Sequence, residues 1–178
     1  MDTRGCGITA ESKRRVIEAD TNAGVEWITR LDEAVGEVFQ SMLERNCAPV
    51  KQDSASSPDI SARITFSGSL EAQCVVEFPA ASAERLTNAF LGVAADSAAA
   101  RWDDAMIGDA VGELCNMIAG GWKKRLGAPA LGSDLSVPTI FRGPSRLPAD
   151  DMPQPSRINM RRAYAFDDAP FVVSLTIL

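Results

Sequence analysis

The segment Asp109–Leu126, DAVGELCNMIAGGWKKRL, has the apolar repeat of an α-helix and carries polar residues outside that repeat. Four apolar residues recur at steps of three or four and share one face: Ile107, Val111, Leu114 and Ile118. At about 3.6 residues per turn, a second row falls roughly on the opposite face: Asp109, Glu113, Asn116 and Gly120. The apolar face must pack on a sheet, so the second row should face solvent or a partner.

Glycine is frequent in this helix, at Gly112, Gly120 and Gly121. Each costs roughly 1 kcal/mol of helix stability relative to alanine, so three in one helix need a reason. Close approach of another chain to the helix surface is such a reason, because glycine has no side chain to hold a neighbour away. We therefore predict that Gly112 and Gly120 belong to a docking surface.

Composition excludes several classes of function. The chain has 178 residues, a formal net charge of −6 and no histidine. Without histidine there can be no Ser-His-Asp triad, no Cys-His pair and no His-ligated zinc site. The acidic balance argues against nucleic-acid binding, which needs a basic patch to contact phosphates.

The cysteines point to a reducing environment. Cys6, Cys47, Cys74 and Cys115 include no CxxC pair of the kind that binds metal, so we expect free thiols and no metal site. No apolar run approaches the roughly 18 residues of a membrane span. The N-terminus lacks the apolar core of a signal peptide. These features favour a cytoplasmic protein without a membrane span.

The N-terminal part of the chain is expected to contain a tail and one long helix. Residues 1–22 are polar and without sustained periodicity, and we expect a flexible tail there, with a helical piece within Ala10–Ala19 left open. The folded domain is then residues 23–178. Apolar residues at helical steps predict an amphipathic helix over Val25–Glu44, and Lys51–Pro58 is expected to be a linker.

Alternating apolar residues predict strands in the rest of the chain. Residues 62–78 alternate on both sides of a Ser-Gly-Ser turn and indicate a β-hairpin, followed by a helix over Ala80–Leu91 with Phe90 on its buried side. Three further strands are expected after the central helix: Leu135–Arg142, Ile158–Phe166 and Phe171–Leu178. The last two should form a hairpin, and the proline-rich stretch Gly143–Ser156 a loop. The fold class is α+β, a mainly antiparallel sheet packed against long helices.

One short internal similarity links two helices. Ala34–Leu43, AVGEVFQSML, resembles Ala110–Ala119, AVGELCNMIA, and aligns Gln40 with Asn116. Both chance and an ancient duplication can explain a match of this length.

The motif Asp109-x3-Glu113-x2-Asn116, followed by Pro138 in the next strand, resembles the signature of the CheC/CheX/FliY chemotaxis phosphatases. In that family an acidic or serine residue precedes E-x-x-N and a proline follows; here the proline comes one residue early. The wider sequences GDAVGELCNMIAGGWKKRL, LSVPTIFRG and ITFSGSLEAQCVVEFP are similar to the CheX branch in particular. The resemblance extends from Trp27 to Leu178.

The resemblance implies a phosphatase that hydrolyses the aspartyl phosphate of a receiver domain such as CheY, in chemotaxis or another two-component system. In that family Asn116 would position the attacking water, and Glu113 would pair with a lysine of the receiver. The docking surface would include Asp109, Gly112, Gly120 and Pro138. The chain would need no cofactor of its own, because the Mg²⁺ belongs to the receiver, and it would form a homodimer.

The sequence is compatible with three hypotheses about function. The first is the phosphatase, whose mechanism depends on positioning and therefore needs no histidine or metal ligand. The second is a non-catalytic module of the same fold that binds receiver or flagellar switch proteins. The third is a structural dimerisation domain, which leaves the glycines and the exposed Glu113–Asn116 pair unexplained. The aligned pair Glu37 and Gln40 is expected to be inactive, because glutamine would hold its amide one methylene too far out.

Overall fold

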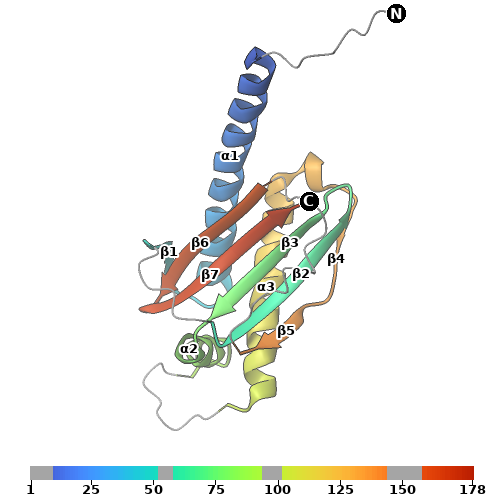
Figure 1. Ribbon diagram of the computed structural model, residues 1–178. Coiled ribbons are helices and arrows are strands. Elements are labelled where there is room, and N and C mark those ends of the chain that lie inside the picture. The colour runs from blue at the N-terminus through green and yellow to red at the C-terminus, as the bar shows by residue number, and fades with distance from the viewer. Residues whose placement is uncertain (1–9, 52–57, 94–101, 144–157) are drawn as a thin grey trace, which may run out of the picture.

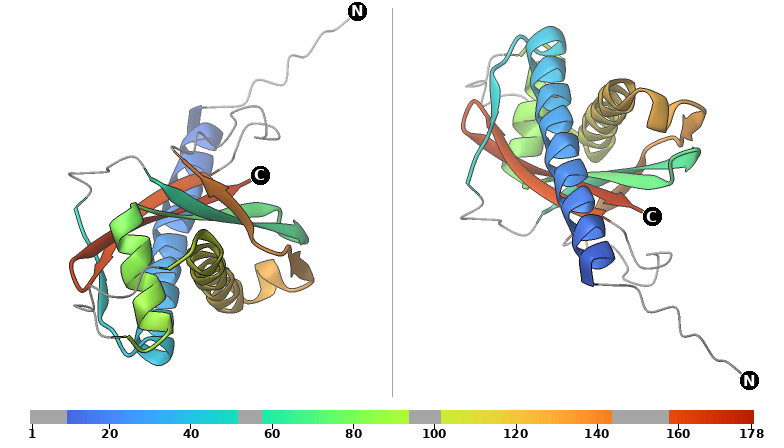
Figure 2. Two further views of the ribbon diagram at one scale, coloured as in Figure 1. Left: turned by 90° about the horizontal axis from the view of Figure 1, so that it is seen from below. Right: turned by 90° about the horizontal axis from the view of Figure 1, so that it is seen from above.

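The computed structural model describes residues 10–51, 58–93, 102–143 and 158–178. In this part of the chain, a seven-stranded antiparallel sheet carries three helices on one of its faces (Figures 1 and 2). The predicted class, α+β with a mainly antiparallel sheet packed against long helices, is confirmed. No helix in these ranges is both long and apolar enough to cross a membrane.

The sheet contains both predicted hairpins. Its strands in chain order are β1 Cys47–Pro49, β2 Ile60–Gly68, β3 Ala72–Phe78, β4 Ser133–Leu135, β5 Thr139–Arg142, β6 Ile158–Phe166 and β7 Ala169–Ile177. They lie side by side as β1-β6-β7-β3-β2-β4, and β5 also pairs with β2. The β6–β7 turn is tight, because Phe166 pairs with Ala169 and both aspartates between them have positive φ.

The strand expected over Leu135–Arg142 is interrupted in the structure. β4 and β5 both pair with β2, but their registers differ by one residue, so Ser136–Pro138 stands opposite only Ile64 and Thr65. This extra residue is a β-bulge, which bends the strand. Proline lacks the N–H that a regular ladder needs, and it is tolerated at a bulge because the ladder is interrupted there.

Three α-helices cover the sheet: α1 Ala10–Met42, α2 Ala80–Phe90 and α3 Asp104–Leu126, with a short 3₁₀ turn, η1, at Ala128–Ala130. The ends of α3 follow from its sequence. The carboxylate of Asp103 accepts a 2.8 Å hydrogen bond from the backbone N–H of Met106 and so caps the first turn. Gly127, with a φ of 64°, ends the helix.

The helix α1 begins earlier than its apolar pattern indicates. It starts at Ala10 rather than Val25, so the part of the expected tail from Ala10 onward is helical, while residues 1–9 lie outside the described chain. The segment before Gly24 contains no proline or glycine and is rich in alanine, glutamate, lysine and arginine, which are strong helix formers. Most of the linker over Lys51–Pro58 and of the loop over Gly143–Ser156 also lies outside the described residues.

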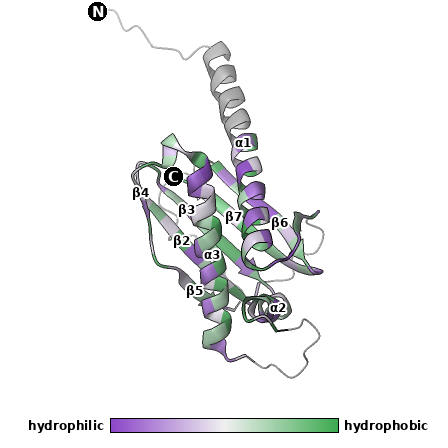
Figure 3. Ribbon diagram, turned by 180° about the vertical axis from the view of Figure 1, so that it is seen from behind, coloured by the Kyte–Doolittle hydropathy of each residue, from purple (hydrophilic) through white to green (hydrophobic). Residues whose placement is uncertain are grey.

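The core lies between the helices and the inner face of the sheet. A cluster of four phenylalanines fills its centre: Phe39, Phe78, Phe166 and Phe171. Trp122 of α3 is fully buried, and the rings of Trp27 on α1 and Phe66 on β2 pack edge-on against it. The helices α1 and α3 lie side by side on this face (Figure 3). This packing fixes which face of α3 points away from the core.

Candidate functional site

The inner face of α3 packs against the sheet. Val111, Leu114 and Ile118 have no exposed surface, and Ile107 at the start of the helix is half-buried. Each fully buried apolar side chain of this size contributes about 2 kcal/mol relative to exposure. The predicted apolar stripe is therefore confirmed, and α3 is a fixed support for whatever its other face presents.

The outer face of α3 presents the predicted polar row. Asp109, Glu113 and Asn116 are exposed, and Gly120 is half-buried. Within the described chain, the side chains of Glu113 and Asn116 make no hydrogen bond or ion pair. Residues three apart on a helix are neighbours, with their Cβ atoms about 5–6 Å apart, so both side chains can contact one partner together.

The chemistry of this pair is that of positioning. The Asn116 amide can donate and accept hydrogen bonds at once, and it stays neutral at any physiological pH. The Glu113 carboxylate accepts hydrogen bonds and attracts a cation. Together they can orient a water molecule and bind a basic group.

Gly112 differs from the other residues expected at the docking surface, because it is buried. A Cβ added to it would lie 3.2 Å from Cδ1 of Ile140 and 3.4 Å from Cβ of Pro138. Gly112 therefore makes room for the chain's own β4–β5 connection, which corrects the expectation that another chain approaches it. Pro138, half-buried beside Gly112, borders the exposed row on this side.

Gly120 and Gly121, near the end of α3, have surroundings that differ from those of Gly112. A Cβ on Gly121 would lie 3.5 Å from Cβ of Ala34, an ordinary van der Waals distance, so α1 packs beside this position without requiring glycine there. A Cβ on Gly120 would meet nothing within 4 Å in the described chain. No contact within the described residues therefore requires glycine at position 120 or 121.

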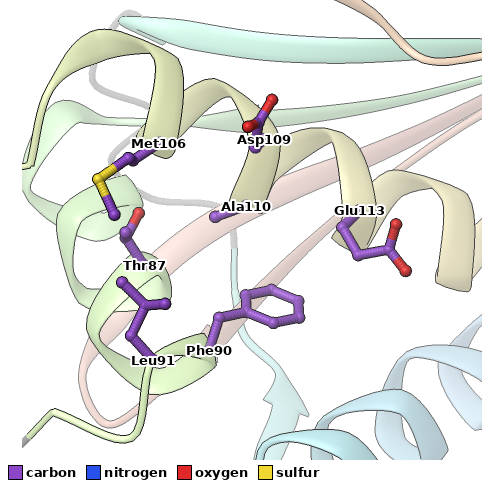
Figure 4. Close-up of a pocket in the computed structure, with 7 residues that line it drawn as sticks. All are labelled: Thr87, Phe90, Leu91, Met106, Asp109, Ala110 and Glu113. Atoms are coloured by element: carbon purple, nitrogen blue, oxygen red, sulfur yellow. The ribbon is translucent and has the colours of Figure 1, made fainter.

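A hollow of about 340 Å³ borders the row on the side of α2 (Figure 4). Two helices line it, with Thr87 and Phe90 from α2, Leu91 directly after α2, and Met106, Asp109, Ala110 and Glu113 from α3. The Phe90 ring extends from α2 toward Ala110 and Glu113 (Figure 4). The sequence predicts Phe90 to be buried and does not predict this hollow. The feature of the sequence that could have indicated the hollow is a pair of large apolar residues, Phe90 and Leu91, just before the helix is stopped by Gly92.

The second E-x-x-amide motif is arranged differently. Glu37 on α1 forms an ion pair with Arg125 near the end of α3. The hydrogen bond from Arg125, reinforced by its charge, lowers the pKa of Glu37. Gln40 is exposed. The carboxylate of this motif is already bound within its own chain, and the inactivity of Glu37 and Gln40 stays a prediction.

The cysteines and the possible metal ligands of the described chain are considered next to the exposed pair. Cys74 and Cys115 are free and buried, and the Sγ of Cys115, although next to Asn116 in sequence, lies 3.5 Å from the carbonyl oxygen of Ala62 in the core. Burial raises the pKa of the free thiol of Cys47 to about 12, so it holds little reactive thiolate. Across the described ranges, no group of three or more Cys, Asp or Glu side chains could hold a metal ion.

One known protein family matches this chain. The family model described as chemotaxis phosphatase CheX matches residues 60–152, a range that includes the polar row of α3 and Pro138. No curated protein sequence is similar enough to give a match.

Several solved structures share the fold. The chemotaxis protein CheX of Desulfovibrio desulfuricans is 19% identical with a TM-score of 0.65, covering 86% of this chain and 99% of its own. A putative chemotaxis protein of Desulfovibrio vulgaris Hildenborough is 22% identical with a TM-score of 0.65, covering 87% and 98%. A CheX–CheY–BeF₃–Mg²⁺ complex from Borrelia burgdorferi matches at 17% identity and a TM-score of 0.59, covering 85% and 97%.

Proposed function

The chain belongs to the chemotaxis phosphatase CheX family, and we propose that it hydrolyses the aspartyl phosphate of a CheY-like receiver domain. The observation that carries this proposal is the exposed Glu113–Asn116 pair on α3, whose side chains have no partner within the described chain. The similar CheX of Borrelia burgdorferi was solved in a complex with CheY, BeF₃ and Mg²⁺, which supports a receiver domain as the partner.

Asn116 is proposed to act on the attacking water. As α3 enters the receiver's active site, the amide oxygen of Asn116 accepts a hydrogen bond from a water molecule and aligns it with the phosphorus. Phosphoryl transfer depends mainly on positioning and electrostatics, so a neutral amide can accelerate it without accepting a proton. The rigid packing of α3 favours this role, because the amide must not drift from the line of attack.

Glu113 is proposed to dock the receiver. Its carboxylate would pair with a lysine of the receiver and so fix the angle at which α3 enters. Such a pair gives orientation and specificity more than raw affinity. The Mg²⁺ needed for receiver phosphorylation would stay on the receiver, so no metal ion is assigned to this chain.

Three other residues are proposed to surround the contact. Asp109 lies one turn before Glu113, Gly120 leaves open surface one turn after Asn116, and Pro138 borders the row. The homodimer implied by the CheX resemblance is part of the same proposal, and sedimentation equilibrium of the purified chain measures it.

The first experiment follows phosphate release from phosphorylated receiver domains of the same organism, in Mg²⁺, with and without this protein. Wild type should accelerate release from at least one receiver. Asn116→Ala should reduce the accelerated rate on the order of 100-fold, because the water loses its positioning group. Its stability should change by no more than about 0.5 kcal/mol, because the position is exposed.

The matched control is Gln40→Ala, which removes an exposed amide from the aligned position of α1 and should leave the rate unchanged. If wild type adds nothing to the decay of any receiver, the catalytic proposal is wrong. Binding without acceleration would then identify a non-catalytic docking module. If Asn116→Ala is as fast as wild type, the activity belongs to other residues.

A further inference from the structure

Large apolar side chains are exposed immediately beside the Glu113–Asn116 pair. Leu91 is 48% exposed and Met106 is 38% exposed, while Phe90 is half-buried between α2 and α3. These three side chains are among those that line the 340 Å³ hollow (Figure 4). Apolar surface that gathers in a hollow, next to a few polar groups, is typical of a binding site.

The hollow is held in shape by the fold. Asn88 on α2 accepts a 2.7 Å hydrogen bond from Nε1 of Trp102, just before α3, and this bond ties the two helices together. Thr87 donates its hydroxyl to the carbonyl of Ala83 at 2.9 Å, so it adds no free donor to the lining. Ala110, small and buried, lets α2 lie close to α3. A preformed hollow loses little conformational entropy when it is filled.

Position and charge indicate what fills it. Glu113 belongs both to the lining of the hollow and to the exposed pair, so a protein that docks on Asn116 also covers the hollow. Two carboxylates, Asp109 and Glu113, border the apolar lining. The chemistry that fits is an apolar side chain with a basic group close by, both on the docked protein.

We infer that the occupant is an apolar side chain of the receiver domain, and that the hollow selects which receiver is bound. The inference rests on the proposed phosphatase function, and it assigns to Phe90, Leu91 and Met106 a specificity role. Apolar contacts away from the phosphoryl group bind the ground state and the transition state equally. They therefore change the dissociation constant and KM while leaving kcat unchanged.

The test uses Leu91→Ser and Met106→Ser, titrated against the receiver loaded with beryllium fluoride and Mg²⁺, which mimics the phosphorylated state without hydrolysis. Each variant should raise Kd and KM roughly tenfold, as expected for the loss of one buried apolar contact, with kcat within about twofold of wild type. The control is Val25→Ser on α1. Val25 is more exposed than either, at 60%, but it lies two residues before Trp27, whose ring packs against Trp122 of α3, and its variant should change neither constant.

A double-mutant cycle identifies the contact on the other side. Exposed apolar residues of the receiver are changed to alanine one at a time, and one of them should lose about the same affinity. Its effect should not add to that of Leu91→Ser, because both changes remove the same contact.

The outcomes separate this inference from the proposed function. Unchanged Kd in both serine variants, with Asn116→Ala still inactive, would overturn the role of the hollow and leave the phosphatase standing. A wild-type protein that adds nothing to the decay of any receiver would count against the phosphatase assignment instead, and a fully active Asn116→Ala would count against the role of Asn116. If Leu91→Ser turns a dimer into a monomer in sedimentation and leaves Kd unchanged, a second copy of the chain covers the hollow and the inference is wrong.

Discussion

Asn116 and Gln40 occupy matching places in two similar helices, but their neighbouring carboxylates differ. Glu37, three residues before Gln40, is held by Arg125, whereas Glu113, three residues before Asn116, has no partner in the described chain. A carboxylate that is already paired must give up that pair before it can bind a partner's lysine. The difference between the two motifs is therefore in both the length of the amide stem and the state of the carboxylate.

The proposed docking role of Glu113 predicts a particular response to salt. Glu113→Gln removes the charge and keeps the shape, so Kd for the beryllium fluoride-loaded receiver should rise about tenfold. The affinity of the variant should also depend less on ionic strength than that of wild type, because salt screens the pair that the variant lacks. Titrations at low and high salt measure both effects.

The control for this prediction is Glu71→Gln, which removes an exposed carboxylate at the β2–β3 turn. It lowers the net negative charge by the same amount and should leave Kd within about twofold of wild type. Equal effects of the two substitutions would mean that Glu113 acts only through the overall charge of the protein.

At the scale of the helix, substitution of Gly120 should change stability and activity in opposite directions. The space around it is open and its φ is ordinary, so Gly120→Ala should stabilise the protein by about 0.5–1 kcal/mol through helix propensity. If the receiver's surface approaches the helix there, the same substitution should raise KM several-fold. Urea unfolding and receiver dephosphorylation together measure the two opposite effects.

Gly36 on α1 offers a matched comparison, because an added Cβ also meets nothing within 4 Å there. Gly36→Ala should give a similar gain in stability without any change in KM. A Gly120→Ala variant that is both more stable and as active as wild type would remove Gly120 from the docking surface.

Periodicity predicts those elements that bury one face. The two hairpins and α3 were predictable because their apolar residues recur at steps of two or of three and four, and a shift by one residue would expose the whole apolar set. The outward direction of Glu113 and Asn116 follows from the same rule, since the opposite face of α3 must be buried.

Other elements depend on contacts that no local pattern contains. The strand β1 has only three residues and exists because it pairs with β6, so alternation could not indicate it. The bulge that brings Pro138 against Gly112 depends on the register of two strands on β2. The hollow beside Glu113 depends on how closely α2 approaches α3. The role of Gly112 was misjudged for this reason, since its neighbours are distant in sequence.

At the scale of the whole molecule, the long helix α1 is joined to the sheet by a polar cluster. Arg162 on β6 donates to both carboxylate oxygens of Asp32, from Nε at 3.1 Å and from a terminal nitrogen at 2.8 Å. Tyr164 donates its hydroxyl to the same carboxylate at 2.7 Å. Burial, together with this hydrogen bond, raises the pKa of Tyr164, so its phenol stays a donor. One carboxylate thus satisfies two side chains of the neighbouring strand.

Removing that carboxylate should destabilise the molecule without changing its chemistry. Asp32→Ala leaves Arg162 and Tyr164 without their acceptor in a partly buried place, and the free energy of unfolding should fall by about 2 kcal/mol. Asp32→Asn keeps one acceptor oxygen and should lose less. Glu33→Ala is the control, because this exposed neighbour lies 3.6 Å from Arg125 and such surface pairs contribute at most about 1 kcal/mol.

Urea unfolding followed by circular dichroism measures these differences, and an unchanged m-value would show that the same surface is exposed on unfolding. The value of kcat/KM per folded molecule should stay at the wild-type level, because the cluster lies between α1 and β6 and does not touch α3. A loss of kcat/KM in stably folded Asp32→Asn would show that the position of α1 affects the exposed pair. In that case α1 would help to position Glu113 and Asn116, through its contacts with Trp122 and Gly121 of α3.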